Sequence, residues 1–127
     1  METANQSMEN EIKTMTLQTG KYLTFILADE DYGIGILKVK EIIGMMSITS
    51  VPKTPEFVKG VINLRGKVIP VLDLRLKFLM DEIEYNARTC IIVVEIDSND
   101  NTLLIGIVVD SVSEVLNIRS GEIESAP

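Results

Sequence analysis

Short apolar runs that alternate with turn-forming residues constrain the fold of this chain more than any other feature. The runs Lys21–Ala28, Cys90–Ile96 and Thr102–Val109 are rich in β-branched, aromatic and other large apolar residues, which is the composition of β-strands. Turn residues separate the runs at intervals of about ten residues, a pattern that favours an antiparallel barrel or sandwich over a doubly wound sheet. We therefore predict a mainly β fold with a few short helices.

Three segments have the pattern of a β-hairpin, in which two apolar runs flank a short turn. The first turn is acidic, the second contains the dipeptide Arg65-Gly66, and the third is a polar stretch after Ile96. The first predicted hairpin consists of Lys21–Ala28 and a second run that starts at Tyr32, and the other two cover residues 61–72 and 90–109. Gly33 and Gly35 predict a bend or a bulge in the first hairpin. Pro70 predicts that part of its strand is an edge or is bulged, because proline cannot donate to a ladder.

Short helices are predicted at three places. Thr54–Gly60 combines a hydroxyl cap, a proline in the first turn and a terminal glycine, which are typical of a helix of one or two turns. Asp73 is placed to cap a second helix through the sequence LRLKFLM. A third short helix is expected after Val109.

A short internal echo indicates two related halves. Ile34-Gly35-Ile36 is followed by Val39-Lys-Glu-Ile42, and Ile105-Gly106-Ile107 by Val112-Ser-Glu-Val115. The match is brief and its spacing differs by two residues, so a structural repeat and chance both remain open.

The 127 residues suffice for one domain, or for two very small barrels that share a core. Residues 1–19 are polar and lack periodicity, so we expect a flexible arm, followed by one domain over residues 20–127. The longest apolar stretch, Leu103–Val109, is far shorter than the roughly 20 residues that cross a bilayer. The N-terminus lacks the pattern of a secretory signal, and the single cysteine, Cys90, fits a reducing cytosol.

The residue types present exclude much catalytic chemistry. The chain has no histidine, so it lacks the commonest general base and metal ligand. Cys90 lies in an apolar run, where a thiol is expected to be inert, and no phosphate-binding glycine loop occurs. The polar stretch Asp97–Asn101 lacks the glycine and distant glutamate of a calcium loop. We therefore predict no metal and no cofactor.

Two other functions remain open from the residues alone. A small barrel that binds nucleic acid is disfavoured by the net charge of −7 and by the 5% aromatic content, because such proteins use clustered cations and stacking rings. A hydrolase with paired carboxylates would need acids such as Glu30, Asp31 or Glu41 to converge in one cleft. Surface charge is the simpler interpretation of these acids.

An ordered series of fragments resembles the CheW family over about residues 21–127. The fragments include Tyr22-Leu-Thr-Phe25, Val51-Pro-Lys-Thr-Pro-Glu-Phe57 and, most specifically, GVINLRG followed by PVLDL at residues 60–66 and 70–74. Ile105-Gly-Ile-Val-Val-Asp110 and the Val-Ser-Glu-Val that follows continue the match.

The resemblance implies two intertwined, five-stranded SH3-like barrels around a shared core and no catalytic activity. It implies a cytoplasmic adaptor that binds the tip of the chemoreceptor coiled coil and the regulatory domain of the histidine kinase CheA, and that is recruited to membrane-associated receptor arrays. Family chains usually continue past the equivalent of Pro127, so we expect a shortened chain in which elements of one barrel are missing and one barrel edge is left open or covered by another chain.

The resemblance also implies the binding residues. One wall of the receptor groove comprises Val39, Glu41 and Ile42, and the other Gly60, Val61, Asn63, Leu64, Arg65 and Gly66. Ile48, Lys59 and Val68 are candidates for the kinase-facing surface. For Arg65 three interpretations stay open: a solvated turn residue, an arginine held structurally by Glu41, or an ion pair that shapes the groove wall. For Val39, Val61 and Leu64 the alternative is ordinary core packing.

Overall fold

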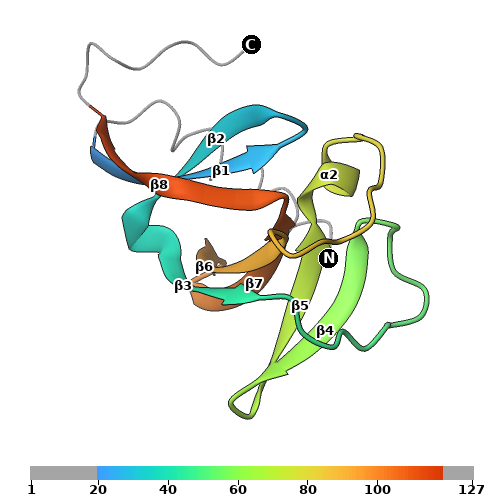
Figure 1. Cartoon of the computed structure of the whole chain (residues 1–127). Coiled ribbons are helices and arrows are strands. Elements are labelled where there is room, and N and C mark those ends of the chain that lie inside the picture. The colour runs from blue at the N-terminus through green and yellow to red at the C-terminus, as the bar shows by residue number, and fades with distance from the viewer. Residues whose placement is uncertain (1–19, 119–127) are drawn as a thin grey trace.

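The computed structural model describes residues 20–118 as two β-sheets with two short helical turns (Figure 1). One sheet has three strands in the order β2-β1-β8, and the other has five in the order β3-β6-β7-β5-β4. The elements are β1 Gly20–Leu27, β2 Glu30–Gly35, η1 Ile36–Lys38, β3 Val39–Gly44, β4 Val58–Leu64, β5 Lys67–Asp73, α2 Leu74–Lys77, β6 Cys90–Ser98, β7 Asn101–Val109 and β8 Ser111–Ile118. The mainly β fold is confirmed, and the predicted arm, residues 1–19, lies outside the described residues.

The two sheets are intertwined by an exchange of strands. The hairpin β1–β2 is followed by β3, which leaves for the five-stranded sheet and pairs with β6. The hairpin β6–β7 is followed by β8, which crosses in the opposite direction and pairs with β1. The two echo segments begin in β2 and β7 and end in the exchanged strands β3 and β8. The echo therefore marks a structural repeat of a hairpin plus one exchanged strand.

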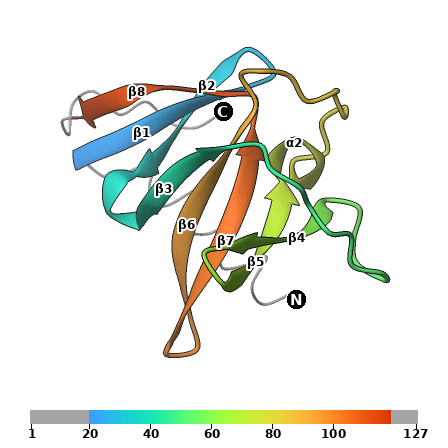
Figure 2. The same ribbon diagram turned by 60° about the horizontal axis from the view of Figure 1, so that its bottom comes forward.

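The five-stranded sheet closes on itself through the segment after β3. Thr49 and Val61 form an antiparallel bridge, with N–H donors and C=O acceptors 2.9 Å apart in both directions. This bridge joins the chain that leaves β3 at one edge of the sheet to β4 at the other edge. The sheet thus curls into a small barrel, which is visible below the three-stranded sheet in Figure 2.

Alternation along the strands divides the apolar residues between two cores. The first core lies between the two sheets and includes Phe25, Leu72, Ile92 and Ile107. The second core fills the barrel and includes Ile62, Ile69, Ile91, Val93 and Val108. Because side chains in a strand alternate between faces, β6 contributes Ile92 to the first core and its neighbours Ile91 and Val93 to the second.

The three predicted hairpins are confirmed as β1–β2, β4–β5 and β6–β7. Arg65 and Gly66 form the second turn with φ of 51° and 85°, and the Asn63 side chain accepts a hydrogen bond from the Gly66 N–H at 2.9 Å. The proline prediction also holds, because β5 pairs with β7 only from Val71 onward. Pro70 therefore lies on a part of β5 that has β4 as its only described neighbour.

One of the three predicted helices is confirmed. The Asp73 side chain accepts from the Leu76 N–H and caps α2. The predicted helix over Thr54–Gly60 is wrong: this stretch consists of turns and the start of β4. The helix expected after Val109 is also wrong, because β8 follows there. No described helix is long and apolar enough to cross a membrane.

Candidate protein-binding site

An ion pair between Glu41 and Arg65 joins β3 to the turn of the β4–β5 hairpin. The Arg65 Nη2 donates to Glu41 Oε1, and this bond raises the pKa of the Arg65 guanidinium. The Arg65 side chain remains 71% exposed and that of Glu41 29% exposed. The predicted pairing of these two residues is therefore present, with the arginine accessible to a partner.

The pair lies on the rim of a charged cleft at one end of the barrel. The cleft has a volume of about 600 Å³ and is lined by Lys40, Glu41, Leu64, Arg65, Lys67, Ile69, Val93, Glu95, Thr102 and Leu104. A second ion pair crosses its rim, between Lys40 Nζ and Glu95 Oε2 at 2.8 Å. Leu64, Ile69, Val93 and Leu104 belong to or pack on the second core, so the cleft has charged edges over an apolar floor.

The three predicted residues of β3 do not form one wall. Residues paired across antiparallel strands point to the same face of the sheet, and Val39 pairs with Val94 whereas Glu41 pairs with Val93. Val94 belongs to the first core and Val93 to the second. A bulge between Val39 and Glu41 shifts the register. Glu41 therefore faces the charged cleft, whereas Val39 packs against the first core.

Ile42 lies on the same face as Val39. It pairs with Ile92 of the first core and is 45% exposed. Ile42 is therefore exposed on a different face from Glu41 and Arg65.

The predicted residues of β4 are divided in the same way. Leu64 packs against the second core and lines the charged cleft, whereas Val61 and Asn63 lie opposite Pro70 and Val68 on the outer face. Gly60 is buried with φ +143°, and a Cβ at this position would lie 2.0 Å from the Thr49 carbonyl oxygen. Gly60 thus permits a close approach of this chain to itself, not of a partner helix.

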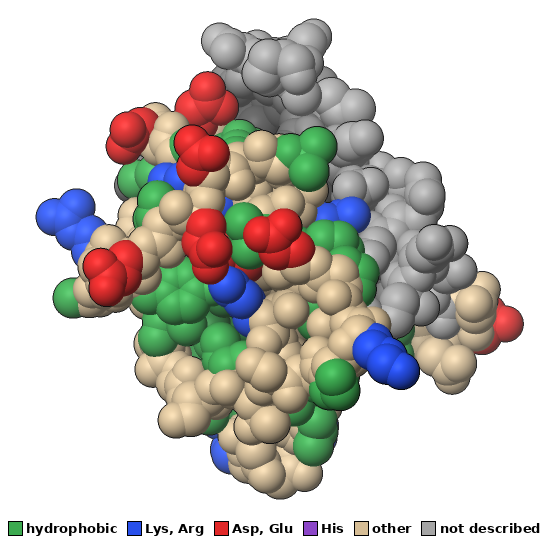
Figure 3. All heavy atoms as spheres, turned by 90° about the vertical axis from the view of Figure 1, so that its right-hand side faces the viewer, with side chains coloured by type: hydrophobic (Ala, Val, Ile, Leu, Met, Phe, Trp, Pro, Cys, Tyr) green, Lys and Arg blue, Asp and Glu red, His purple; other side chains and the backbone are tan. Residues whose placement is uncertain are grey.

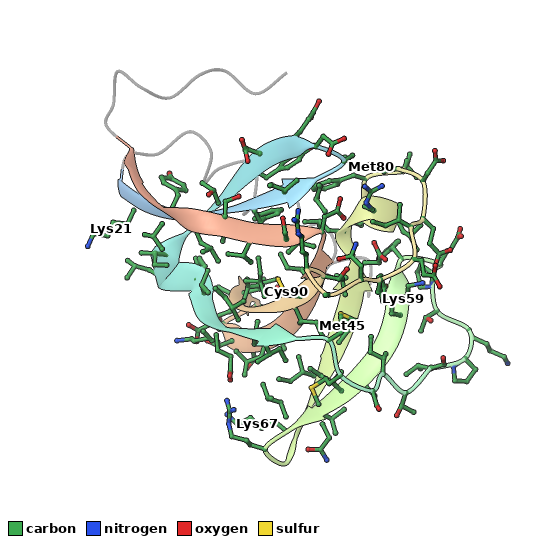
Figure 4. All side chains as sticks on the ribbon, in the orientation of Figure 1. Lys21, Met45, Lys59, Lys67, Met80 and Cys90 are labelled. Carbon is green, nitrogen blue, oxygen red and sulfur yellow. The ribbon has the colours of Figure 1, made fainter. Side chains whose placement is uncertain are left out.

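A second, apolar groove lies where β5 and β7 separate. It has a volume of about 560 Å³ and is lined by Val58, Lys67, Val68, Ile69, Pro70, Leu72, Thr102, Leu103, Leu104 and Ile105. Val68 is 69% exposed and Leu103 38% exposed, although both are large apolar residues. Lys67 extends from the β4–β5 turn (Figure 4) and is the charged residue of this groove.

The other two kinase-facing candidates lie elsewhere. Ile48 is half-buried and packs against the second core. The Lys59 Nζ pairs with Glu82 Oε1 at 2.6 Å and lies 5.8 Å from the centre of the Tyr85 ring. Figure 3 shows acidic side chains gathered on this side of the molecule, above a hydrophobic surface. Lys59 therefore holds the loop after α2, and of the three candidates only Val68 lines the apolar groove.

The sequence interpretation missed Lys40, Glu95, Lys67 and Leu103 as surface-lining residues. An alternating strand pattern places Lys40 and Glu95 at the surface, but their contact depends on the register of β3 against β6. The apolar run around Leu103 predicts a buried strand. Leu103 is exposed because β5 and β7 separate beside it. Neither the contact between Lys40 and Glu95 nor the exposure of Leu103 can be predicted from the local sequence.

The described residues bring together no group of three or more metal-ligating side chains. Burial raises the pKa of the Cys90 thiol, which disfavours the reactive thiolate. Glu41 is engaged by Arg65, and Glu30 accepts a hydrogen bond from the Tyr32 hydroxyl. The arrangement suits contacts with another protein better than bond-making chemistry.

Comparison with known proteins agrees with these features. The profile of the CheW-like domain matches residues 21–127. Chemotaxis protein CheW of Klebsiella aerogenes is 45% identical over 84% of this chain, and that of Helicobacter pylori is 37% identical over 84%. The chain spans 62% of the length of each of these two relatives.

A solved structure extends the comparison to the fold. The scaffolding protein TtCheW from Thermoanaerobacter tengcongensis superimposes with a TM-score of 0.73 at 40% identity, over 82% of this chain and 68% of that one. A profile match over most of the sequence, relatives of this identity and a shared fold lead to one conclusion: the chain belongs to the CheW family.

Proposed function

We propose that the chain is a non-catalytic adaptor that couples chemoreceptors to the histidine kinase CheA. The observation that carries the proposal is the presence, on one small barrel, of two adjoining surfaces of different chemistry: the charged cleft and the apolar groove. They share Lys67, Ile69, Thr102 and Leu104 at their border, and each extends away from it over its own residues. An adaptor needs two such surfaces, because partners that compete for one surface cannot be joined. Membership of a family that includes a named scaffolding protein supports the same role.

The charged cleft is the proposed contact for the receptor tip. An amphipathic helix needs an apolar groove with a few charged fixtures. Leu64 and the apolar floor supply the first, and the Glu41–Arg65 pair supplies the second. This favours the third interpretation of Arg65, an ion pair that shapes the wall of the site. Ile42 would extend the contact on the neighbouring face.

The apolar groove is the proposed contact for the regulatory domain of CheA. Val68 and Leu103 expose apolar surface on either side of it, and burial of such surface drives most protein association. The adaptor would act in the cytoplasm and would reach the membrane only through the receptor array.

Charge exchange tests the assignment of the receptor. Arg65→Glu and Glu41→Arg should each weaken binding of a purified receptor-tip fragment by about tenfold or more, which corresponds to roughly 1.4 kcal/mol. The double variant, which restores an ion pair with reversed polarity, should recover part of the affinity. Lys53→Glu makes the same charge change at an exposed residue outside both surfaces and should leave binding unchanged. Equal affinity of all four variants would refute the assignment.

A parallel experiment tests the kinase surface. Val68→Asp should weaken binding of the CheA regulatory domain, whereas Leu37→Asp should not, because Leu37 is 89% exposed and lies in η1, outside the groove. The melting temperature of both variants is measured beside affinity. Unchanged kinase binding by Val68→Asp, with the fold intact, would overturn the assignment.

A further inference from the structure

Arg75 and Asp110 form a bidentate ion pair where the two sheets meet. Arg75 Nε donates to Asp110 Oδ1 at 2.8 Å, and Nη2 donates to Oδ2 at 2.7 Å. The side chains are only 14% and 20% exposed. Arg75 belongs to α2, which follows the five-stranded sheet, and Asp110 lies between β7 and β8, where the chain crosses to the three-stranded sheet. Paired, charge-assisted bonds of this kind are strong and geometrically specific.

The Asp110 carboxylate also holds the turn of the β1–β2 hairpin. Its Oδ2 accepts from the Ala28 N–H at 2.9 Å, and the Asp110 N–H donates to the Ile26 carbonyl at 3.1 Å. Ala28 and Asp29 have φ of 50° and 65°, a conformation that side-chain-bearing residues adopt at a cost. The carboxylate therefore stabilises a turn that contains no glycine.

An aromatic contact adds to this junction. The Tyr32 ring of β2 stacks on Phe25 with centroids 5.8 Å apart, and its centroid is 6.1 Å from that of Phe78, the residue after α2. Figure 1 shows the tip of the hairpin beside α2. Arg75 Nη1 also donates to the Asp81 carbonyl at 3.1 Å. This bond links the loop after α2 to the ion pair.

We propose that Arg75 and Asp110 form a latch that holds the tip of the β1–β2 hairpin against α2, and that the tip opens while β1 stays paired with β8 and the barrel stays folded. Burial of apolar residues between the sheets holds the sheets together but is non-directional, so it does not fix the position of the hairpin tip. The ion pair and the Ala28 bond fix that position. The described contacts between the hairpin tip and α2 are few, namely the Ala28 bond, the ion pair and the Tyr32–Phe78 ring contact, and segments held by few bonds commonly open locally. Opening of the tip alone leaves β1 paired with β8 and leaves the second core intact, because that core contains no residue of the hairpin.

Amide hydrogen exchange of the full chain, followed by NMR, tests the latch. In Arg75→Gln, protection of the amides of Leu27–Glu30 and of α2 should fall by about tenfold or more, and that of Ile91–Val94 in the barrel should stay within about twofold. Lys40→Gln, which removes an ion pair inside one sheet, should leave hairpin exchange unchanged. Unchanged hairpin protection in Arg75→Gln, or an equal fall throughout the domain, would overturn the proposal.

The unmodified chain provides an independent test should Arg75→Gln fail to fold. Amides that exchange through local opening depend weakly on low urea concentration, because little surface is exposed. The amides of Leu27–Glu30 should show this weak dependence, and those of Ile91–Val94 should depend strongly on urea. The same strong dependence at both places would show that the hairpin opens only with the whole domain, and would contradict the latch.

Discussion

Gly60 lies at the point where β4 meets the segment after β3, and it determines whether the barrel can close. Its φ of +143° and the 2.0 Å separation between a hypothetical Cβ and the Thr49 carbonyl oxygen both exclude a side chain. That carbonyl accepts one of the two hydrogen bonds of the Thr49–Val61 bridge. The glycine is therefore a condition for closure of the sheet.

Gly60→Ala should lower the free energy of unfolding by about 2 kcal/mol or more, because it combines backbone strain with a clash against the main chain. Urea unfolding followed by circular dichroism measures the loss. Gly44→Ala is the matched control, since nothing lies within 4 Å of a Cβ there, and it should be close to neutral. Equal effects of the two substitutions would disprove this role of Gly60.

Leu79 occupies a position that favours glycine. The Met80 N–H bonds to the Arg75 carbonyl and the Leu79 N–H to the Leu76 carbonyl, the pattern that ends many helices with a left-handed residue. Leu79 has φ 60° and is 94% exposed, so its side chain gains almost no burial. Leu79→Gly should therefore raise the free energy of unfolding by about 1 kcal/mol, measured by urea unfolding.

Leu79→Ala is the control for that substitution, because it removes the apolar side chain but keeps the unfavourable φ. It should give no comparable gain. A destabilised Leu79→Gly variant would show that the leucine makes a contact that outweighs its backbone strain.

At the scale of elements, the loop between α2 and β6 is held by a partly buried hydrogen bond. The Tyr85 hydroxyl donates to Asp73 Oδ2 at 2.8 Å, and Asp73 also caps α2. Burial, together with this bond, raises the pKa of Tyr85. A residue twelve positions away thus fixes the loop to the start of the helix.

Tyr85→Phe should cost about 1–2 kcal/mol in the free energy of unfolding, because the variant leaves a buried carboxylate oxygen short of a donor. The bond requires the protonated phenol, and the folded pKa lies above the unfolded value of about 10. Its contribution is therefore full below about pH 10 and is lost as the pH rises through the folded pKa. Unfolding measured between neutral and alkaline pH should show a steeper loss in the unmodified chain than in Tyr85→Phe. Identical slopes would contradict the role of this bond.

The hairpins could be predicted from sequence because each depends on local information: two apolar runs and a turn. The stretch Thr54–Gly60 was wrongly predicted to be a helix, because its hydroxyl, proline and glycine also suit turns. The Val58 N–H bonds to the Pro55 carbonyl and the Phe57 carbonyl accepts from Asp73. Pairing with distant β5 therefore decided the structure of this stretch. The segment after Val109 became a strand for the same reason, since β1 is its partner.

The site was predictable in part. The family resemblance places Glu41 and Arg65 on the walls of one groove, and their pairing was among the three interpretations of Arg65 that it left open. The division of Ile42 from Glu41 follows from the alternation of side chains along a strand. The division of Val39 from Glu41 does not follow, because it depends on a bulge beside Lys40. A shift of one residue moves every side chain to the other face, and the sequence near Lys40 carries no mark of the bulge.

At the scale of the whole molecule, strand exchange makes the two sheets interdependent. The strand that follows each of the hairpins β1–β2 and β6–β7 pairs in the sheet of the other hairpin: β3 pairs with β6, and β8 pairs with β1. The barrel that carries both proposed binding surfaces is thus completed by β3, the strand that follows the β1–β2 hairpin of the other sheet. The surfaces are fixed relative to each other by one closed barrel, which suits an adaptor that must hold two partners at a constant distance.

The most direct test of the adaptor is whether both partners bind at once. The full chain is mixed with a receptor-tip fragment and the regulatory domain of CheA, and sedimentation velocity is measured with each protein labelled in turn. We predict a ternary complex that contains the receptor tip and the kinase domain only when this chain is present. Displacement of one partner by the other, or no complex with either at high concentration, would contradict the account.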